Sequence, residues 1–415
     1  MSAVPVDDSL LPAARHLAGR DATDLLRVAV ASFGGDLAQA EAVQVQHRPG
    51  QDLVVRYDAS VAWSGRAARR ETLLAASTSA GAPPGTLVLT ADGMEAGVWR
   101  YPFDPRLPGL ADAVTPGRVD RLLAGALRGR PELEVVAYRP IRRAVVRATD
   151  GEREVYLKVL RPEETAAIAE RHHRLRSAGL PVPEVLNVDE ALGLLVLAAL
   201  PGHNLRDRLL VGTSAWPRAA DYVTLMTALA AVELPPSVTD PAPMGPAEMA
   251  AGHARALVAI LPGEAHRLDR IVRCLQDLPA DLGPTVTIHG DLYEAQLMVD
   301  GRGALTGLLD LDDAGVGHPI ADAATLLAHL HILQPDTRRH REHLHRYRVR
   351  LRDAMVDAFD PTGDATELDR RTAGVLVGLA TGPFRAQRVR WQVEVRRRLA
   401  MAERLVGEKT LRHAS

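Results

Sequence analysis

The stretch TVTIHGDLYEAQLMVDGRGALTGLLDLDDAGVGHP, residues 285–319, decides the fold. Its pattern predicts three short apolar strands joined by turns, at 286–288, 297–299 and 305–309. The first strand leads into His289–Asp291 and the third leads into Asp310. A carboxylate at the end of an apolar strand is partly desolvated, which is costly unless the group binds a metal, a hydrogen-bond donor or a cation. We therefore expect a functional site where these strands end.

The polar side chains of this stretch have the spacing of a kinase catalytic loop. In the arrangement H-G-D-x-x-x-x-Q, Gln296 follows Asp291 by five positions, and Asp310 follows Asp291 by 19. In kinases an Asp accepts the proton of the substrate hydroxyl, an amide five residues later binds Mg²⁺, and a later Asp reaches the phosphates through the metal. The HGD triplet alone would be a weak signal, but the three features together predict phosphoryl transfer.

Lysine is almost absent from the chain. Of 50 basic residues only Lys158 and Lys409 are lysines. Because arginine serves where charge alone is needed, Lys158 in the apolar strand EVYLKVL is expected to have a chemical role. The alternative is a surface lysine at the end of a strand. Lys409, in VGEKT, lacks the glycine that a Walker A loop needs directly before its lysine, and it is expected to be dispensable.

These segments resemble the aminoglycoside phosphotransferase and choline kinase superfamily, the small-molecule relatives of protein kinases. Besides HGD and LLDLDDAGVGHPIADAATL, the resemblance includes LPVPEV before a fourth strand and LLVLAALPG as a connection between lobes, and it covers roughly 131–405. It implies an α+β protein with a kinase-like two-lobed fold, a β-rich N-lobe and a helical C-lobe. Some superfamily members with an N-terminal cap, such as maltose and glucosamine kinases, phosphorylate sugars.

The resemblance also implies roles in the catalytic loop. Asp291 would be the catalytic base, and His289 would shape its loop. Gln296 and Asp310 would be the ligands of Mg²⁺. The family usually has Asn where Gln296 stands. Glutamine offers the same carbonyl oxygen one methylene further out, so ligation stays possible with a different geometry.

In the nucleotide site, Lys158 would neutralise the α- and β-phosphates of ATP, with Glu170 as its ion-pair partner. The alternative for Glu170 is a surface acid, the usual fate of a helical Glu. Backbone groups around Ala198 and Leu200 would bind the adenine edge. A glycine-rich phosphate loop is missing, because the first turn of this lobe is Arg139–Arg143. Either its arginines cover the phosphates instead, or the turn is simply solvated.

The chain divides into a cap domain at 1–130, an N-lobe with its hinge at 131–202 and a C-lobe at 203–415. The cap is expected to be an α/β domain and contains an echo of the N-lobe. VQHRPGQDLVVRY at 45–57 aligns with VAYRPIRRAVVRA at 136–148 with six identities. We interpret the cap as a degenerate N-lobe copy that has lost the lysine. The alternative is a chance likeness between two basic hairpins.

The last segment is expected to be one helix, at 384–406, that walls the acceptor site. Its spacing places Gln387, Trp391 and Glu394 on one face. A tryptophan with flanking polar groups would suit a sugar or aminosugar ring. The alternative is a Trp packed in the helical lobe with arginines reaching past it.

Composition excludes several classes of function. The net charge of −2 argues against a nucleic-acid binder, whose affinity depends on a basic surface. The longest apolar run, Leu194–Leu200, is far shorter than the roughly 20 residues of a membrane span. The first residues do not resemble a signal peptide, and the single cysteine, Cys274, fits a reducing compartment. A cytoplasmic protein with no nucleic-acid or membrane partner is expected.

The sequence thus predicts an ATP- and Mg²⁺-dependent phosphotransferase that acts on a hydroxyl of a small molecule. By analogy with capped members of the superfamily, the first candidates are a sugar, an aminosugar or an aminoglycoside. Two alternatives stay open: a nucleotide-binding pseudokinase or regulatory module, and a kinase for a choline-like or nucleoside acceptor. The sequence leaves undecided the choice between ATP and GTP and the oligomeric state.

Overall fold

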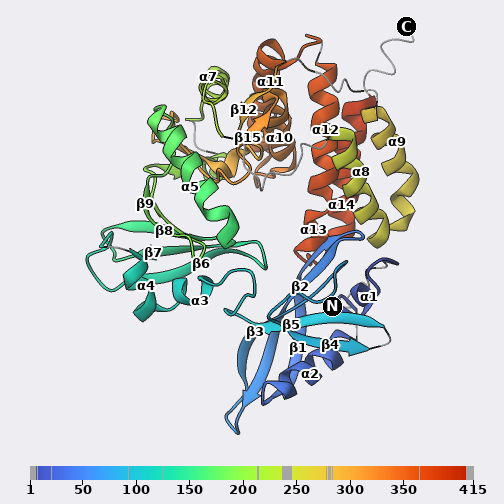
Figure 1. Cartoon of the computed structure of the whole chain (residues 1–415). Coiled ribbons are helices and arrows are strands. Elements are labelled where there is room, and N and C mark those ends of the chain that lie inside the picture. Colours follow the sequence, from blue (N-terminus) through green and yellow to red (C-terminus); the bar gives the residue numbers. More distant parts are fainter. Residues whose placement is uncertain are drawn as a thin grey trace.

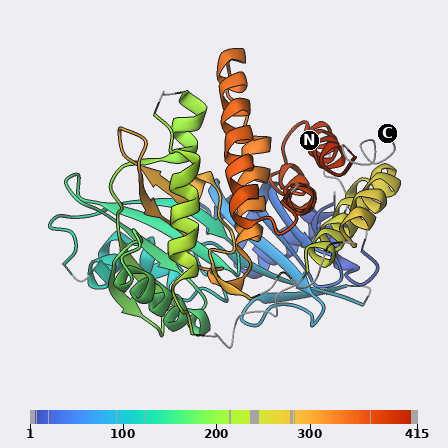
Figure 2. The ribbon, with the colours of Figure 1, turned by 90° about the horizontal axis from the view of Figure 1, so that it is seen from above.

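The computed structural model describes residues 6, 8–19, 21–91, 93–123, 125–212, 215–235, 245–276, 278, 282, 284–363 and 365–407. It has the β-rich N-lobe, the helical C-lobe and the extra N-terminal domain that were expected (Figure 1). Seen from above, in Figure 2, long helices of the C-lobe stand over the two β-rich parts. No helix in the described part of the chain is long and apolar enough to cross a membrane.

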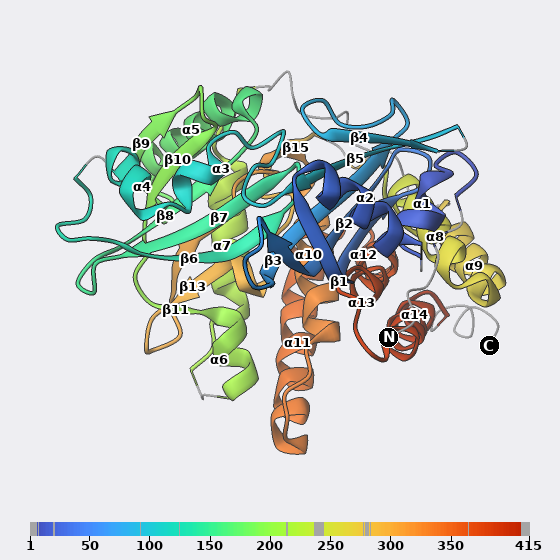
Figure 3. The same cartoon turned by 90° about the horizontal axis from the view of Figure 1, so that it is seen from below.

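The cap is built on a five-stranded antiparallel sheet of order β1-β2-β3-β5-β4. Its strands are β1 (Gly35–Arg48), β2 (Asp52–Trp63), β3 (Arg69–Thr78), β4 (Leu87–Ala91) and β5 (Met94–Arg100). Its helices are α1 (Ala13–Leu17), α2 (Ala22–Ser32), α3 (Leu110–Ala113) and α4 (Pro116–Leu123). Figure 3 shows α1 and α2 over one face of this sheet, beside the N-lobe sheet.

The N-lobe is a second five-stranded sheet, of order β6-β7-β8-β10-β9, with one helix. Its elements are β6 (Glu132–Arg139), β7 (Arg143–Thr149), β8 (Glu154–Val159), α5 (Pro162–Ser177), β9 (Val185–Asp189) and β10 (Leu194–Ala198). The start of α5 follows from its sequence, because Pro162 stands in the first turn and two acidic residues follow it. Residues of β7 alternate between buried and half-buried, as expected for a strand with one face on a core.

The two sheets share their strand order. In the cap, pairing of the first hairpin ends at Arg48 and Asp52; in the N-lobe it ends at Arg139 and Arg143. These are the positions that the sequence alignment superposes. A turn-containing segment at 79–86 takes the place of α5 in the cap. The common order supports our proposal that the cap is a degenerate copy of the N-lobe.

The C-lobe combines long helices with short strands that carry the loops of interest. Its helices are α6 (Leu205–Val211), α7 (Ala219–Ala230), α8 (Pro246–Ile260), η1 (Pro262–Glu264), α9 (Ala265–Gln276), η2 (Glu294–Gln296), α10 (Pro319–Ile332), α11 (Arg338–Phe359), α12 (Thr366–Ala380), α13 (Gly382–Arg385) and α14 (Trp391–Gly407). Its strands are β11 (His203–Asn204), β12 (Val286–Ile288), β13 (Leu297–Val299), β14 (Leu305–Leu308) and β15 (Gly315–Gly317).

One expected helix is wrong. The segment 384–406 is not continuous, because the backbone of Gln387 adopts a left-handed conformation with φ 47°. A residue in this region cannot continue a right-handed helix. The segment is therefore split between α13 and α14.

The two faces of the cap sheet belong to different hydrophobic cores. On one face Val55 and Leu73 join a buried cluster with Leu376 of α12 and Leu399 of α14. The opposite face, which includes Leu74, joins a cluster with α3, α4 and the N-lobe sheet. The cap therefore contacts the N-lobe through one face and the C-terminal helices through the other.

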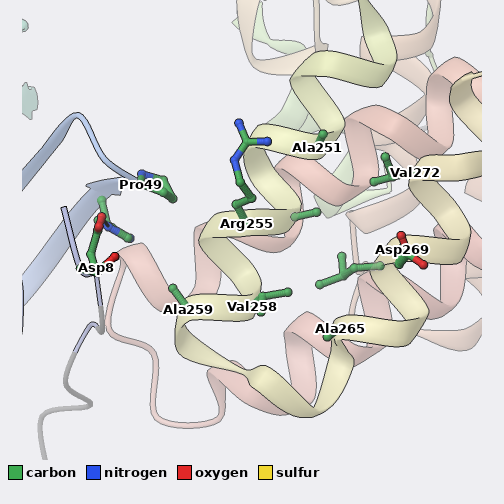
Figure 4. Close-up of a pocket in the computed structure, with 13 residues that line it drawn as sticks. Asp8, Pro49, Ala251, Arg255, Val258, Ala259, Ala265, Asp269 and Val272 are labelled. Atoms are coloured by element: carbon green, nitrogen blue, oxygen red, sulfur yellow. Dashed lines mark hydrogen bonds and ion pairs between the residues drawn. The ribbon is translucent and has the colours of Figure 1, made fainter. Parts of the chain in front are cut away.

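A hollow of about 460 Å³ marks the edge of the contact between the cap and helices α8 and α9. Figure 4 shows Asp8 and Pro49 on the cap side, opposite Arg255 of α8. Asp8 accepts a hydrogen bond from the backbone N–H of Gly50 at 2.8 Å and pairs with His47 Nε2 at 2.8 Å. These bonds hold the N-terminal segment against the β1–β2 turn, next to the C-lobe.

Candidate active site

The loop after β12 is held by a buried carboxylate. Asp322 of α10 is 1% exposed, and its two oxygens accept the backbone N–H groups of His289 and Gly290 at 2.7 and 2.9 Å. Gly290 has φ 82°, and a Cβ there would lie 2.2 Å from the carbonyl oxygen of Asp313. Only glycine fits this position. Asp322 is thus a structural acid that holds this loop.

His289 connects the two strand ends. Its imidazole is fully buried, and Nε2 lies 2.8 Å from the backbone carbonyl of Leu309, one residue before Asp310. That contact requires Nε2 to carry the proton, so Nδ1 can accept the backbone N–H of Asp291 at 3.3 Å. The side chain therefore fixes the loop of Asp291 relative to Asp310, which is the shaping role expected for it.

Asp291 has a strongly shifted protonation equilibrium. Burial raises the pKa of its carboxyl group from 3.8 to about 7, and the negative charges of Asp313 and Asp310 contribute to the rise. Both causes act in the same direction, because each disfavours the ionised form. A carboxyl group with a pKa near neutrality is suited to accept a proton at physiological pH.

The two expected metal ligands are neighbours. The amide Nε2 of Gln296, at the end of η2, donates to Asp310 Oδ2 at 3.2 Å. Gln296 is 7% exposed, and Asp310 follows β14 with a left-handed φ of 55°. Among the described residues, no three His, Cys, Asp or Glu side chains are arranged to hold a metal. Metal binding here would combine Asp310 and Gln296 with oxygens of a ligand.

Lys158 of β8 is 4% exposed, and its side chain contacts Asp310 and a second carboxylate, Asp312. Its ammonium group is 2.8 Å from Asp310 Oδ1, and it also forms an ion pair with Asp312. Burial alone would lower the pKa of Lys158, but Asp312 and Asp310 hold it above its ordinary value. The expected alternative of a surface lysine at a strand end does not describe this buried side chain.

Arg143 is a further cation in the site. From the first position of β7 its guanidinium donates to both oxygens of Asp310, at 3.2 and 2.8 Å, and it contacts Asp312. Burial opposes ionisation of Asp310, yet Lys158 and Arg143 hold the pKa of this carboxyl group below its ordinary value. The arginine turn is therefore not simply solvated, since one of its members enters the site.

The cap anchors the arginine turn. Asp104, 5% exposed, accepts the backbone N–H of Ile141 at 2.8 Å and the hydroxyl of Tyr138 at 2.7 Å through the same oxygen. Ile141 has φ 57°, a left-handed conformation that is unfavourable for a β-branched residue. The carboxylate thus stabilises a turn that, without glycine, would have little intrinsic preference for its shape.

The predicted ion pair between Lys158 and Glu170 is wrong. Glu170 pairs with Arg174 one helical turn on, at 2.7 Å, and its side chain is 45% exposed. The next residue, Arg171, is 5% exposed and donates to the backbone carbonyl of Asp312. Helix α5 therefore faces the site with Arg171, whereas Glu170 lies on its solvent side.

The connection between the lobes follows β10. The backbone N–H of Ala198 donates to the carbonyl of Glu184 at 2.9 Å, and Leu200 lies two residues beyond the end of the strand. Both residues are half-buried. Adenine binding by backbone groups at Ala198 and Leu200 stays a prediction.

The expected acceptor face of the last helix does not form. Trp391 is 5% exposed and packs edge-on against Phe384, at 5.1 Å between ring centroids, within the core that the cap shares. Gln387 lies before α14, where its side-chain amide donates to the carbonyl of Phe384. Glu394 pairs with Arg388 at 2.9 Å. Trp391 is therefore a packing residue, the alternative reading of its pattern.

Some residues beside Asp291 had no recognisable sequence signal. Tyr293 stacks on His329 at 4.0 Å between centroids, and Arg206 lies over its ring at 5.4 Å. Arg206 also pairs with Glu294, which is fully buried, at 2.7 Å. Tyr293 and Glu294 lie between Asp291 and Gln296, and this position was the sequence feature that could have indicated a role for them. Arg206 and His329 come from distant helices and had none.

Comparisons with known proteins identify the family of the chain. A family model described as the phosphotransferase enzyme family matches residues 141–355. Viomycin phosphotransferase from Streptomyces vinaceus is 31% identical over 162 residues, or 36% of this chain. The match spans 56% of that curated relative, about half its length. The resemblance inferred from the sequence motifs is confirmed.

Two solved structures are similar to this chain to different degrees. The GDP complex of a mutant aminoglycoside 2'-phosphotransferase has a TM-score of 0.50 and 14% identity, and the similarity covers 69% of this chain and 94% of that one. A choline/ethanolamine kinase family protein from Mesorhizobium loti has a TM-score of 0.46 and 19% identity, over 71% and 92% of the two chains. The first likeness confirms the two-lobed kinase-like fold.

Proposed function

Because the chain belongs to the phosphotransferase enzyme family, we propose that it transfers the terminal phosphate of ATP, with Mg²⁺, to a hydroxyl group of a small molecule. One observation carries this proposal. His289 ties the loop of Asp291 to the backbone carbonyl of Leu309, directly before Asp310, and the carboxyl group of Asp291 has a pKa of about 7. A candidate proton acceptor and a candidate metal ligand are thus carried on two loops that one buried side chain joins, an arrangement that suits phosphoryl transfer.

The residues present fit a divalent cation with nucleotide phosphates. Asp310 stays ionised because of its cationic neighbours, and Gln296 would offer its carbonyl oxygen once the amide group turns over. Mg²⁺ prefers a few carboxylate or carbonyl oxygens completed by phosphate and water. Bound there, the cation would supply charge neutralisation on the phosphates.

Asp291 would orient the acceptor hydroxyl and remove its proton during transfer. A base works best when its pKa is close to the operating pH, because it is then both deprotonated and sufficiently basic. The carboxyl group gains this pKa from its surroundings, and the contacts of His289 and Asp322 fix its loop. The loop would therefore be preorganised before the substrate binds.

Lys158 would exchange carboxylate partners for phosphate oxygens. Its ammonium now contacts Asp310 and Asp312, and burial makes any loss of a counter-charge costly. Nucleotide phosphates would provide that counter-charge while the carboxylates turn to other cations. Because a planar guanidinium cannot reproduce a compact ammonium group, Lys158→Arg is expected to impair turnover strongly.

A sugar, an aminosugar or an aminoglycoside is the acceptor that we propose first. The similarity to the viomycin phosphotransferase of Streptomyces vinaceus supports a small-molecule acceptor. The test is ATP consumption with a panel of sugars, aminosugars and aminoglycosides, with choline and nucleosides as further arms. Wild type should turn over with one group of acceptors, and Asp291→Asn should lose roughly 10²–10⁴-fold in rate.

The outcomes separate the alternatives. Nucleotide binding without turnover on any acceptor would favour a pseudokinase. Turnover that Asp291→Asn leaves unchanged would remove Asp291 from the mechanism. Turnover restricted to choline-like or nucleoside acceptors would keep the reaction and replace the acceptor class.

A further inference from the structure

A cavity of about 450 Å³ lies between the cap and the N-lobe. Its walls come from the first hairpin of each sheet and from the start of α5, and it extends to the loop after β14. The lining residues on the cap side include Arg48, Asp52 and Thr78, whereas Asp291, Gln296 and Lys158 do not line it. The cavity is thus adjacent to the candidate active site and shares Arg143, Arg171 and Asp312 with it.

Positive charge dominates the lining. Seven arginines and four carboxylates line the cavity; the arginines are Arg48, Arg106, Arg139, Arg142, Arg143, Arg161 and Arg171. Four of them form ion pairs with acids: Arg48 with Asp52, Arg161 with Glu164, Arg106 with Glu163, and Arg143 with Asp310 and Asp312, while Arg171 donates to the backbone carbonyl of Asp312. Within the described residues Arg139 and Arg142 have no carboxylate partner in an ion pair. Arg139 and Arg142, whose side chains are exposed, therefore add positive charge to this cavity that no ion pair in the described residues balances.

Arg142 and Arg48 line the same cavity. Desolvation and, next, the charge of Arg48 lower the pKa of Arg142. Arg48 ends the first strand of the cap sheet, and Arg142 lies in the turn of the first hairpin of the N-lobe sheet. The two arginines therefore come from different sheets. Like charges that converge on one cavity repel each other unless an anion lies between them.

We propose that this cavity binds a phosphate-bearing small molecule at a site separate from the nucleotide. The volume is that of a small-ligand pocket, and a guanidinium group forms the paired hydrogen bonds that phosphate oxygens accept. Sites for phosphate use several such groups at once, and here they come from both sheets. The proposal goes beyond the kinase function, because the site would exist whatever the acceptor is.

Arg143 connects this cavity with the active site. It lines the cavity, and its guanidinium also holds Asp310 and Asp312. An anion in the cavity would compete with Asp310 for Arg143. Binding in the cavity would thereby make the Asp310 carboxylate more available to other cations.

The test is a calorimetric titration of the whole chain with a hexose 6-phosphate, and separately with inorganic phosphate. The protein is first saturated with Mg²⁺ and a non-hydrolysable ATP analogue, so that the nucleotide site is filled. Arg48→Gln should weaken binding by roughly tenfold, the loss of one charge-assisted hydrogen bond, and Arg142→Gln by a similar factor. Arg338→Gln, which removes an exposed charge on α11, is the matched control and should bind as wild type does.

Each outcome decides the matter. Binding of the hexose phosphate but not of inorganic phosphate would identify a phosphorylated metabolite, whereas equal affinity for both would identify phosphate itself; either supports the site. Loss of binding when the nucleotide analogue is present would mean that the cavity takes the nucleotide's own phosphates, and the proposal would fail. It would also fail if Arg48→Gln bound normally while retaining the wild-type Tm and nucleotide affinity. Nucleotide affinity is measured in the same samples, so a failure of the kinase function is seen separately.

Discussion

Arg143 donates hydrogen bonds to both carboxylate oxygens of Asp310, so an arginine from the N-lobe turn holds the side chain that would bind the metal. The two residues are 167 positions apart and come from different lobes. Their contact joins the two lobes and helps to hold the pKa of the Asp310 carboxyl group below its ordinary value. Under the proposed function, metal binding would have to rearrange this pair, since the metal and the guanidinium would need the same oxygens.

Replacing Arg143 with Met should make metal binding easier. The variant removes the cation that competes for Asp310, so the Mg²⁺ concentration for half-maximal activity should fall by roughly tenfold, about the strength of one charge-assisted hydrogen bond. The measurement is the initial rate as a function of free Mg²⁺ at saturating ATP. Arg143→Lys keeps the charge but loses the paired hydrogen bonds to Asp310, so its Mg²⁺ requirement should lie between those of wild type and Arg143→Met. A higher Mg²⁺ requirement in Arg143→Met would show that Arg143 assists the metal instead.

The rate should depend on the ionisation of Asp291. Because the base must be deprotonated and its pKa is about 7, kcat/KM should rise about tenfold per pH unit below that pH and level off above it. The profile is measured from pH 5 to 9 on the preferred acceptor. An inflection near the ordinary pKa of aspartate would exclude this environment for the free enzyme.

Asp291 should also make the stability of the protein depend on pH. The folded protein keeps this proton between pH 3.8 and about 7, whereas the unfolded chain loses it at the lower value. Its contribution to the free energy of unfolding therefore falls as the pH rises through this window. Asp291→Asn should have a higher Tm than wild type at pH 8 and a similar Tm at pH 4. Equal Tm differences at both pH values would contradict the raised pKa.

Asp104 should stabilise the arginine turn from the cap. Asp104→Ala leaves the Tyr138 hydroxyl and the Ile141 N–H without their acceptor, and the free energy of unfolding should fall by roughly 2–3 kcal/mol. Urea denaturation measures this loss, and the KM for ATP should rise because the turn lies at the phosphate end. Asp112→Ala, which removes a partly exposed ion pair with Arg118, is the control. A normal KM in a destabilised Asp104→Ala would limit the carboxylate to a structural role.

Trp391 should matter for stability and not for the acceptor. Trp391→Ala opens a cavity in the core shared by the cap and the C-lobe and should cost about 3–5 kcal/mol of unfolding free energy. Trp391→Phe keeps most of the volume and should leave the KM for the acceptor unchanged. A large rise in that KM for the Phe variant, with a normal Tm, would return Trp391 to the acceptor wall.

Local patterns were sufficient to predict the two-lobed fold and the strands that carry the candidate catalytic loop. The strands that deliver Asp291 and Asp310 follow from short apolar runs ended by carboxylates, and Lys158 was distinguished by its chemical rarity. These features depend on sequence neighbours and on spacing. The same is true of α5, whose start is determined by its own proline and acidic residues.

The sequence could not predict which face of a helix turns toward the site, or which residues far apart in the chain contact each other. Glu170 and Arg171 are adjacent, and the packing of α5 decides which of them faces the site. The break at Gln387 depends on one left-handed residue that is not glycine. Asp104 and Arg143 act across domain boundaries, so their roles follow from the way the cap and the lobes are packed.

The cap sheet gives this kinase fold a second mechanical link between its lobes. In a two-lobed protein with one connecting strand, the cleft opens by bending that connection. Here the cap sheet also packs against the N-lobe with one face and against α12 and α14 with the other. Opening the cleft must therefore slide one of these two interfaces, and substitutions far from any substrate, in the cap core, should alter how readily the cleft admits its ligands.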